Sequence, residues 1–251
     1  MPLLILHGLF GMLDNWQTVA RVWANRYRVF LLDLRNHGKS PHSDEMDYYD
    51  MAADIASFLE LHNLQNVNLL GHSMGGKVAM QFAAEFPQKT NALIVVDIAP
   101  KKYPAGEHEN IFEALMAIDL DKIPSRSDAE FLLRRYLPDD EATVQFLLKN
   151  LSRHASDGSY VWKFNLPAIY LHYDNILDNP LTAKDRFDKP ALFIKGGNSA
   201  RYIEPEKDWP VILTHFPNAK LEIIANAGHW VHAAQPDLLA NLVLHFLNQH
   251  N

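Results

Sequence analysis

The sequence predicts an α/β fold, with a mostly parallel sheet of about six strands flanked by helices. Two observations support this prediction: short apolar runs alternate with helical patterns, and one long segment between two such runs lacks a clear strand. Apolar runs separated by helices are typical of strands that are buried on both faces of a parallel sheet. The chain is therefore expected to form one strand–helix core with an inserted segment.

The expected elements follow one another along the chain in a regular alternation. The apolar runs expected to form strands are residues 2–6, 28–33, 66–71, 92–98, 191–195 and 220–225. Helical patterns follow or separate them at residues 15–24, 48–62, 75–86, 206–215 and 238–248. The apolar N-terminal run lacks the preceding basic residues and the following cleavage pattern of a signal peptide, so we expect it to be a buried strand.

The interval between Ile98 and Ala191 breaks this alternation and is too long to be a loop. It contains helical patterns at residues 107–118, 128–136 and 141–151, followed by an aromatic-rich part. We interpret residues 101–188 as a helical cap that lies over the carboxyl edge of the sheet. Residues 1–100 and 189–251 would then form the α/β core.

Composition excludes several classes of function. The net charge of −7 argues against a nucleic-acid-binding groove and against attraction to anionic membranes. No cysteine is present, which excludes disulfides, thiolate metal sites and a cysteine nucleophile and suits a cytoplasmic location. No apolar run reaches the roughly 18 residues that a membrane span needs.

The strongest motif is G-H-S-M-G at residues 71–75, which lies between an expected strand and an expected helix. A serine in this setting sits on a sharp turn that lifts its hydroxyl above the sheet edge. Side chains at the two flanking glycines would collide with neighbouring backbone. Ser73 is therefore the expected nucleophile, although the short pattern also occurs by chance as a plain glycine–serine turn.

The loop after the first strand, H-G-L-F-G at residues 7–11, is expected to complete an oxyanion hole. In this pattern one donor is the amide after the nucleophile and another comes from this loop. The candidate donors are the N–H groups of Met74 and Leu9, with that of Phe10 as an alternative for the second. We expect His7 to brace the loop through hydrogen bonds.

The expected base is His229, in the A-G-H-W segment after the last expected strand. His72 and His232 are the rival histidines. His72 is too close in sequence to reach back to Ser73, and His232 lies near the start of the last helix. His229 and His232 could also suggest a metal pair, but no H-E-x-x-H motif or dense cluster accompanies them, so no metal or cofactor is expected.

The acid departs from the commonest placement, which is after the strand before the last one. Asn198 stands there, and an amide cannot balance the charge of an imidazolium. Asp97 lies instead at the end of an apolar strand, where an unpaired carboxylate would be costly to bury. His229 would supply its partner and be held in the required tautomer. Asp97 is therefore the expected acid, with Glu204 as the alternative.

Together these segments resemble the α/β-hydrolase family, and more closely the bacterial YbfF-type esterases. Further matching stretches are D-L-R-N-H-G-K-S-P at residues 33–41, V-D-I-A-P at 96–100, F-I-K-G-G-N-S at 193–199 and G-H-W-V-H-A at 228–233. The resemblance runs along nearly the whole chain and supports Asp97 as the acid. It implies that the opening β-hairpin of the fold is missing, which would leave the strand ending at Asp33 as an exposed edge.

The same resemblance implies a carboxylesterase that acts on small or medium acyl esters, with acyl thioesters such as acyl-CoA as a further substrate class. Phe10, Trp162 and Phe164 are candidates for the acyl pocket, although aromatics at helical spacing are commonly core residues. Same-fold alternatives are a C–C bond hydrolase and a cofactor-free haloperoxidase, and a non-catalytic binding module is the alternative from another class. A monomer or a small homo-oligomer is expected.

Overall fold

The sheet of this protein contains six parallel strands in the order β2-β1-β3-β4-β7-β8. The structure is a computed structural model, and it describes residues 1–250. The strands are β1 (Pro2–Leu6), β2 (Arg28–Leu32), β3 (Val67–His72), β4 (Thr90–Val96), β7 (Ala191–Gly196) and β8 (Ala219–Ile224). Their parallel pairing and their positions confirm the predicted fold class.

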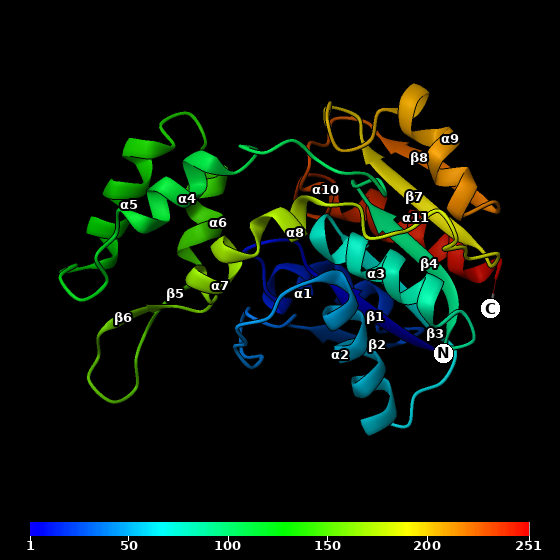
Figure 1. The fold of residues 1–251 in the computed structure, drawn as a ribbon, viewed down its shortest axis with the longest axis horizontal. Helices are drawn as coiled ribbons and strands as arrows, with labels where there is room; N and C mark the ends of the chain where they lie inside the picture. Colours follow the sequence, from blue (N-terminus) through cyan, green and yellow to red (C-terminus); the bar gives the residue numbers. More distant parts are fainter. Residues whose placement is uncertain (251) are drawn as a thin grey trace.

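Helices cover both faces of the sheet. Alternate strand residues point to opposite sides, so each face has its own apolar core to be buried under helices. Leu4 and Leu6 belong to the core under α2 (Tyr48–Leu61), α3 (Met74–Glu85) and α9 (Pro205–His215). Leu3 and Ile5 belong to a second core, under η1 (Leu13–Trp16), α1 (Gln17–Trp23), α10 (Val231–Ala234) and α11 (Pro236–Asn248). Figure 1 shows helices on both sides of the strands, and this burial explains why β1, β4 and β7 are mostly apolar.

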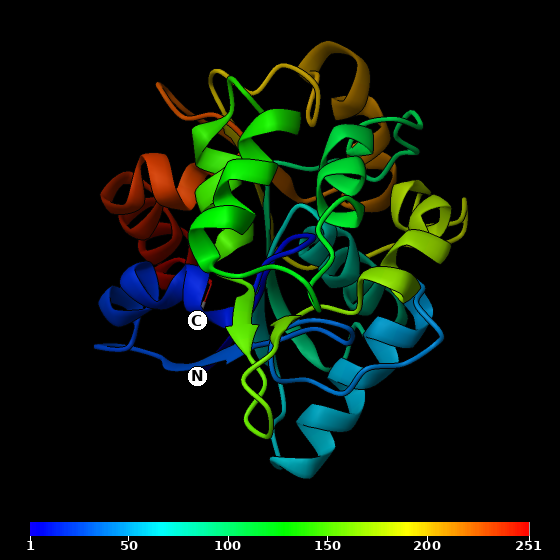
Figure 2. The same cartoon turned by 90° about the vertical axis from the view of Figure 1, so that its left-hand side faces the viewer.

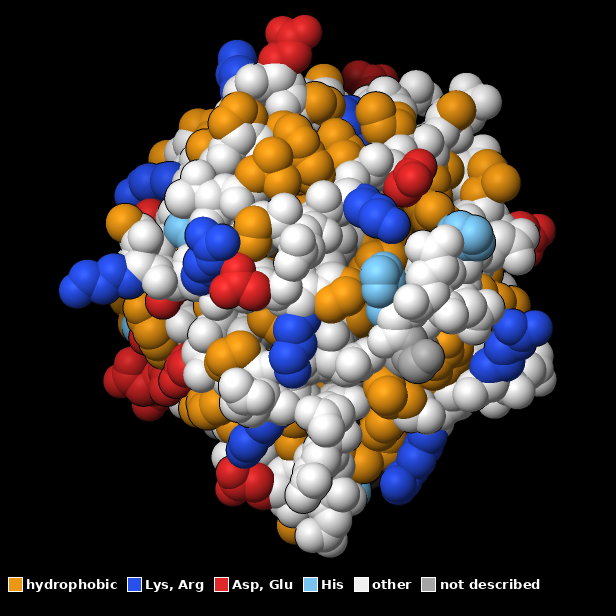
Figure 3. All heavy atoms as spheres, turned by 90° about the vertical axis from the view of Figure 1, so that its right-hand side faces the viewer, with side chains coloured by type: hydrophobic (Ala, Val, Ile, Leu, Met, Phe, Trp, Pro, Cys, Tyr) orange, Lys and Arg blue, Asp and Glu red, His pale blue; other side chains and the backbone are white. Residues whose placement is uncertain are grey.

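Strand β2 forms one edge of the sheet and is mostly half-buried. Within residues 1–250, no strand pairs with its outer side. This arrangement agrees with the expectation that the strand before Asp33 is an edge. On the face opposite the insert, which Figure 3 shows, side chains of both charges are scattered among apolar and uncharged ones.

The segment between β4 and β7, residues 101–188, is here called the cap insert. It contains α4 (Glu109–Met116), α5 (Arg126–Tyr136), α6 (Glu141–Leu148), α7 (Leu166–Leu171) and α8 (Tyr173–Leu177). Figures 1 and 2 show α4, α5 and α6 grouped beyond one end of the sheet. The insert is not purely helical, because β5 (Leu151–Arg153) and β6 (Tyr160–Trp162) form an antiparallel hairpin. Strands of three residues are too short to show an alternating pattern, so the sequence did not indicate them. No helix among the described residues is long and apolar enough to cross a membrane.

Lys77, in the first turn of α3, binds the end of the cap insert. Its buried ammonium group donates to the backbone carbonyls of Leu177, at 2.9 Å, and Asp178, at 2.6 Å. It also lies over the ring of Tyr103, 4.7 Å from the ring centroid. Burial lowers the pKa of Lys77 from 10.5 to about 7, although the charge of Asp178 opposes this shift and that of Lys101 adds to it.

Replacement of Lys77 by Met should flatten the dependence of stability on pH. Between pH 7 and 10.5 the unfolded chain holds a proton on Lys77 that the folded protein has lost. The free energy of unfolding should therefore rise with pH across this window, and the cost of burying the charge should be fully present below it. Urea unfolding at pH 7.5 and 9.5 measures the rise, with Lys102→Met, at an exposed lysine, as the control. Equal slopes for the wild type and Lys77→Met would contradict the shifted titration.

Candidate active site

Ser73 occupies the turn between β3 and α3 in a strained backbone conformation, with φ 52° and ψ −123°. A side chain at Gly71 would place its Cβ 2.1 Å from the carbonyl oxygen of Gly75. A Cβ at Gly75 would lie 2.4 Å from the carbonyl oxygen of His7. The turn is therefore possible only because both flanking residues lack side chains, as the motif predicted.

Hydrogen bonds to the backbone hold this turn in place. The N–H of Ser73 donates to the carbonyl of Val96 at 3.0 Å, and its carbonyl accepts from the N–H of Gly76 at 2.8 Å. The N–H of Met74 starts α3 and has no backbone acceptor among the described residues. Because the first amides of a helix are unsatisfied and carry its positive dipole end, this amide suits a developing oxyanion.

The loop after β1 is held by two buried histidines. His7 Nε2 accepts from the N–H of Leu34 at 3.0 Å, so Nδ1 carries the proton and donates to the carbonyl of Gly8 at 2.8 Å. His37 Nε2 accepts from the N–H of Phe10 at 3.2 Å. Burial lowers the pKa of His7 to about 4 and that of His37 to about 3, so both rings stay neutral. His7 therefore braces the loop, as expected.

Of the two loop amides proposed as oxyanion donors, only one is free. The N–H of Phe10 is used by His37, which removes Phe10 as the alternative. The N–H of Leu9 has no backbone acceptor within residues 1–250, and Leu9 lines the same pocket as Ser73. Leu9 and Met74 are therefore the pair that the structure leaves available.

His229 and Asp97 lie in direct contact. His229 Nδ1 is 2.8 Å from Oδ2 of Asp97, whose side chain is fully buried, whereas 22% of the His229 side chain is exposed. An ionised carboxylate can only accept, so Nδ1 carries the proton and Nε2 is free to act as a base. Ser73 and His229 line the same pocket, and the carboxylate lies behind the imidazole.

Two further groups hold the carboxylate of Asp97. The N–H of Gly196 donates to Oδ1 at 2.9 Å, and the hydroxyl of Ser199 donates to Oδ2 at 2.5 Å. Asp97 itself has a left-handed backbone, with φ 53°. The sequence reasoning placed Asp97 at the end of a strand but missed Ser199. The G-G-N-S segment after β7 could have indicated it, since that loop adjoins the end of β4 in a parallel sheet.

Glu204, the alternative acid, lies in a different environment. It precedes α9, its side chain is 38% exposed, and it pairs with Lys207 at 2.6 Å and Lys101 at 3.6 Å. Asn198 is exposed and bonds through its backbone N–H to the carbonyl of Ala227. Of the acidic candidates, the structure thus brings only Asp97 to His229.

The imidazole of His229 is packed between other rings. Tyr202 stacks on it with ring centroids 3.6 Å apart and an angle of 19° between the planes. His72 lies on another side, at 4.7 Å, and its Nε2 is 2.8 Å from the carbonyl of His229. Burial lowers the pKa of His72 well below its ordinary value, so it is a neutral donor to that carbonyl. Tyr202 was not predicted, because nothing in the sequence indicates which aromatic meets the base.

The rival His232 lines the same pocket and contacts His72, with ring centroids 5.1 Å apart, but it is His229 and not His232 that meets Asp97. His232 stacks on Trp16 at 4.4 Å, and burial lowers its pKa to about 4. Its Nδ1 has no hydrogen-bond partner among the described residues. Within residues 1–250, no group of three or more His, Asp or Glu side chains is arranged to hold a metal ion.

A pocket of about 640 Å³ opens above Ser73, between the strand ends and the cap insert. The core contributes its Leu9, Phe10, Tyr202 and Trp230, and the cap insert contributes residues including Ile111 and Phe146. Three charged residues also line it, namely Glu107, Asp140 and Arg201, and Arg201 pairs with Glu107 at 3.1 Å. The wall thus combines apolar residues with several histidines and other polar groups, which can orient a small molecule.

Trp162 and Phe164 do not line this pocket, although Phe10 does. They are buried, with 8% and 2% of their surfaces exposed, and they stack on each other at 5.3 Å. Phe164 packs against the ring of Phe10 at 5.1 Å. These two rings therefore do not contact the pocket as expected, and Phe164 instead packs against Phe10, which does line it. This position agrees with the general rule that aromatics at helical spacing are commonly core residues.

The fold and this site together define an α/β hydrolase, and comparison with known proteins agrees. A family model described as the alpha/beta hydrolase fold matches residues 1–236. The chain therefore belongs to the α/β-hydrolase fold family, and it is an enzyme of the hydrolase class. The resemblance inferred from the motifs is confirmed.

Individual relatives match nearly the whole chain. It is 38% identical to the esterase YbfF of Escherichia coli, with 98% of this chain and 93% of that protein covered. It is also 38% identical to the sn-1-specific diacylglycerol lipase ABHD11 of Xenopus laevis, with 98% and 79% covered. The solved structure of an esterase from a marine microorganism superposes with a TM-score of 0.93 at 45% identity, with 98% of this chain and 94% of that one covered.

Replacement of Asp97 by Asn should lower kcat by about 10²–10⁴-fold, because the amide cannot hold the required tautomer or balance an imidazolium. Glu204→Gln should change it by less than about threefold, since this half-exposed carboxylate pairs with Lys207 and Lys101 and not with His229. Steady-state kinetics on a p-nitrophenyl ester compare the two variants. Equal losses, or a greater loss for Glu204→Gln, would reverse the assignment of the acid.

Proposed function

We propose that the chain is a serine esterase that hydrolyses acyl esters through Ser73, His229 and Asp97. The observation that supports this proposal most is the contact of His229 with the buried carboxylate of Asp97, beside a pocket that also contains Ser73. The relatives named as esterases support the ester substrate class. The same arrangement argues against a non-catalytic binding module, which has no need of a buried carboxylate behind a pocket histidine.

The proposed reaction proceeds in two acyl-transfer steps. Nε2 of His229 removes the hydroxyl proton of Ser73 as its oxygen attacks the ester carbonyl, and the N–H groups of Leu9 and Met74 stabilise the resulting oxyanion. The imidazolium is stabilised by Asp97 and gives its proton to the leaving alcohol. Water, deprotonated by the same histidine, then hydrolyses the acyl-enzyme and restores Ser73.

An acyl thioester such as acyl-CoA would pass through the same tetrahedral oxyanion, so the mechanism alone admits both substrate classes. The charges of the pocket discriminate between them. The charged residues that line the pocket are two acids, Glu107 and Asp140, and one base, Arg201, which is already paired with Glu107. This wall disfavours the phosphates of CoA, so we propose uncharged esters of small or medium acyl chains as the preferred substrates.

Ser73→Ala should lower the hydrolysis of p-nitrophenyl acetate by at least about 10³-fold and abolish labelling by a fluorophosphonate, because no nucleophile remains. The fold should survive, since Ala adds no atom to the turn. Turnover and labelling are measured on protein whose circular dichroism matches the wild type. Retained turnover in a folded Ser73→Ala protein would refute the nucleophile. Failure of the wild type to react with the fluorophosphonate would favour the binding-module alternative.

A matched pair of substrates tests the preference for uncharged esters. We expect a higher kcat/KM for p-nitrophenyl butyrate than for butyryl-CoA, by about tenfold or more, since like-charge contacts cost binding energy. Addition of salt should narrow the difference, because it screens the repulsion. A higher kcat/KM for butyryl-CoA at low salt would overturn this part of the proposal.

A further inference from the structure

The oxyanion loop is held by a residue of the cap insert as well as by the core. Nδ2 of Asn150 donates to the carbonyl of Phe10 at 2.8 Å, across 140 residues of sequence. Phe10 has a left-handed backbone, with φ 56°, which a bulky residue adopts only when its surroundings hold it there. The contact between Asn150 and Phe10 is therefore one of the constraints on this turn.

The backbone of Asn150 is itself fixed. Asn150 follows α6, its N–H donates to the carbonyl of Leu147, and its carbonyl accepts from the N–H of Lys163, both at 2.9 Å. Its side chain is fully buried. A carbonyl only accepts hydrogen bonds, so the amide must present its NH₂ group to Phe10 rather than its oxygen. The donor is thus presented from a rigid site.

Successive peptide groups of the loop are held in different ways. The carbonyl of Gly8, in the same peptide group as the N–H of Leu9, accepts from the N–H of Gly11 at 2.9 Å and from His7. The next peptide group is held by His37, which accepts from the N–H of Phe10. The third is held at both ends, because its carbonyl, that of Phe10, accepts from Asn150 and its N–H, that of Gly11, donates to the carbonyl of Gly8. A peptide group is planar, so fixing its carbonyl also fixes the direction of its N–H.

We propose that Asn150 is a positioning residue for the oxyanion hole, through which the cap insert takes part in the chemical step. This inference rests on the proposed function, because it assumes that the N–H of Leu9 binds the oxyanion. Loss of the bond to Phe10 leaves the third peptide group held at one end only, through the N–H of Gly11. That N–H holds the carbonyl of Gly8, so a tilt of the third peptide group also shifts the first one. The N–H of Leu9 then no longer points at the position that the oxyanion occupies.

The test uses two variants and an inhibitor that resembles the tetrahedral intermediate. Asn150→Ala removes the donor, and Asn150→Asp keeps the shape but presents a carboxylate to a carbonyl. An alkyl boronic acid forms a bond from Ser73 Oγ to boron, the serine proton passes to His229, and a boron-bound oxygen occupies the oxyanion position. The carboxylic acid product of the ester, which forms no such adduct, measures ground-state binding.

In both variants we expect kcat/KM for p-nitrophenyl butyrate to fall by about 10–100-fold, since a small misplacement near the reacting atoms has effects of this size. The inhibition constant of the boronic acid should rise by the same factor. KM and the inhibition constant of butyrate should change by less than about twofold. Titration with a fluorophosphonate corrects each rate for the fraction of active enzyme.

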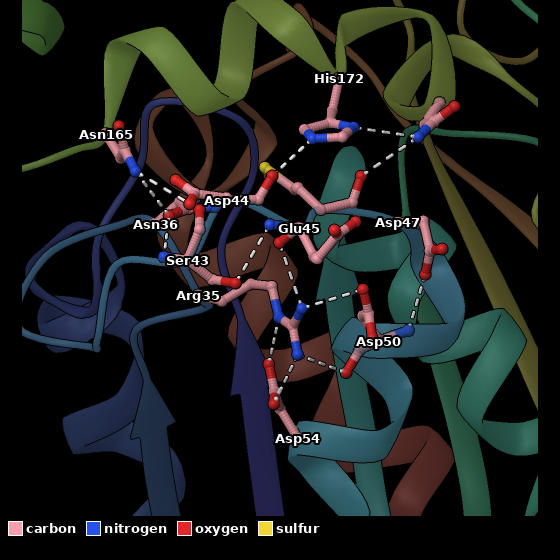
Figure 4. Close-up of polar contacts among 12 residues, drawn as sticks. Arg35, Asn36, Ser43, Asp44, Glu45, Asp47, Asp50, Asp54, Asn165 and His172 are labelled. Carbon is pink, nitrogen blue, oxygen red and sulfur yellow. Dashed lines mark hydrogen bonds and ion pairs between the residues drawn. The ribbon is translucent and has the colours of Figure 1, made fainter.

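His172→Ala is the matched control. His172 also belongs to the cap insert, and its Nε2 lies 2.6 Å from the backbone carbonyl of Asp44 in the core, as Figure 4 shows. The substitution His172→Ala therefore also removes one hydrogen bond between the cap insert and the core. The residues of that bond lie far from the oxyanion loop in the sequence. We expect it to leave the affinity for the boronic acid unchanged.

Equal losses in Asn150→Ala and His172→Ala would overturn the proposal, because the effect would then come from loosening the cap in general. A rise in KM with unchanged boronic-acid affinity would also overturn it, as would failure of both Asn150 variants to fold. A wild-type protein that reacts with neither fluorophosphonate nor boronic acid would instead refute the proposed function.

Discussion

The close approach of the first turn of α3 to the end of β1 is the constraint on which the rest of the site depends. Gly75 lies against the carbonyl groups of Leu6 and His7 with no room for a Cβ. This contact brings the start of the helix and the loop after β1 together, so that Ser73 and the loop line one pocket. The strain at Ser73 persists because the packing on each side of the turn leaves no alternative.

The sheet and the ends of its strands could be predicted because their signals are local. Apolar runs, a glycine-flanked serine and a histidine after the last strand each lie within a few residues of sequence. Asp97 was reached by a different route, since a carboxylate in an apolar strand end needs a partner. Its contact with His229 agrees with that reasoning. Glu204 had only its position along the chain in its favour.

What the sequence could not show was the set of contacts made between distant segments. Three contacts of this kind join residues about 30 to 140 positions apart in the chain: those of Ser199 with Asp97, Tyr202 with His229 and Asn150 with Phe10. Trp162 and Phe164 show the opposite failure, because an aromatic-rich segment indicates burial but not whether the rings face a pocket or the core. Phe164 packs against Phe10 instead, and Trp162 stacks on Phe164. The three-residue strands β5 and β6 were likewise too short to leave a periodic pattern.

The place of the cap insert between two neighbouring strands has a consequence for protein engineering. Because β4 and β7 pair directly, the segment that joins them can be exchanged for that of a homologue without breaking the sheet. The transplanted segment would still have to present an amide donor to the carbonyl of Phe10 and acceptors to the ammonium group of Lys77. A chimera chosen only for the shape of its new binding surface would lose both of these contacts. The exchanged segment should therefore include the two contact positions and keep their geometry.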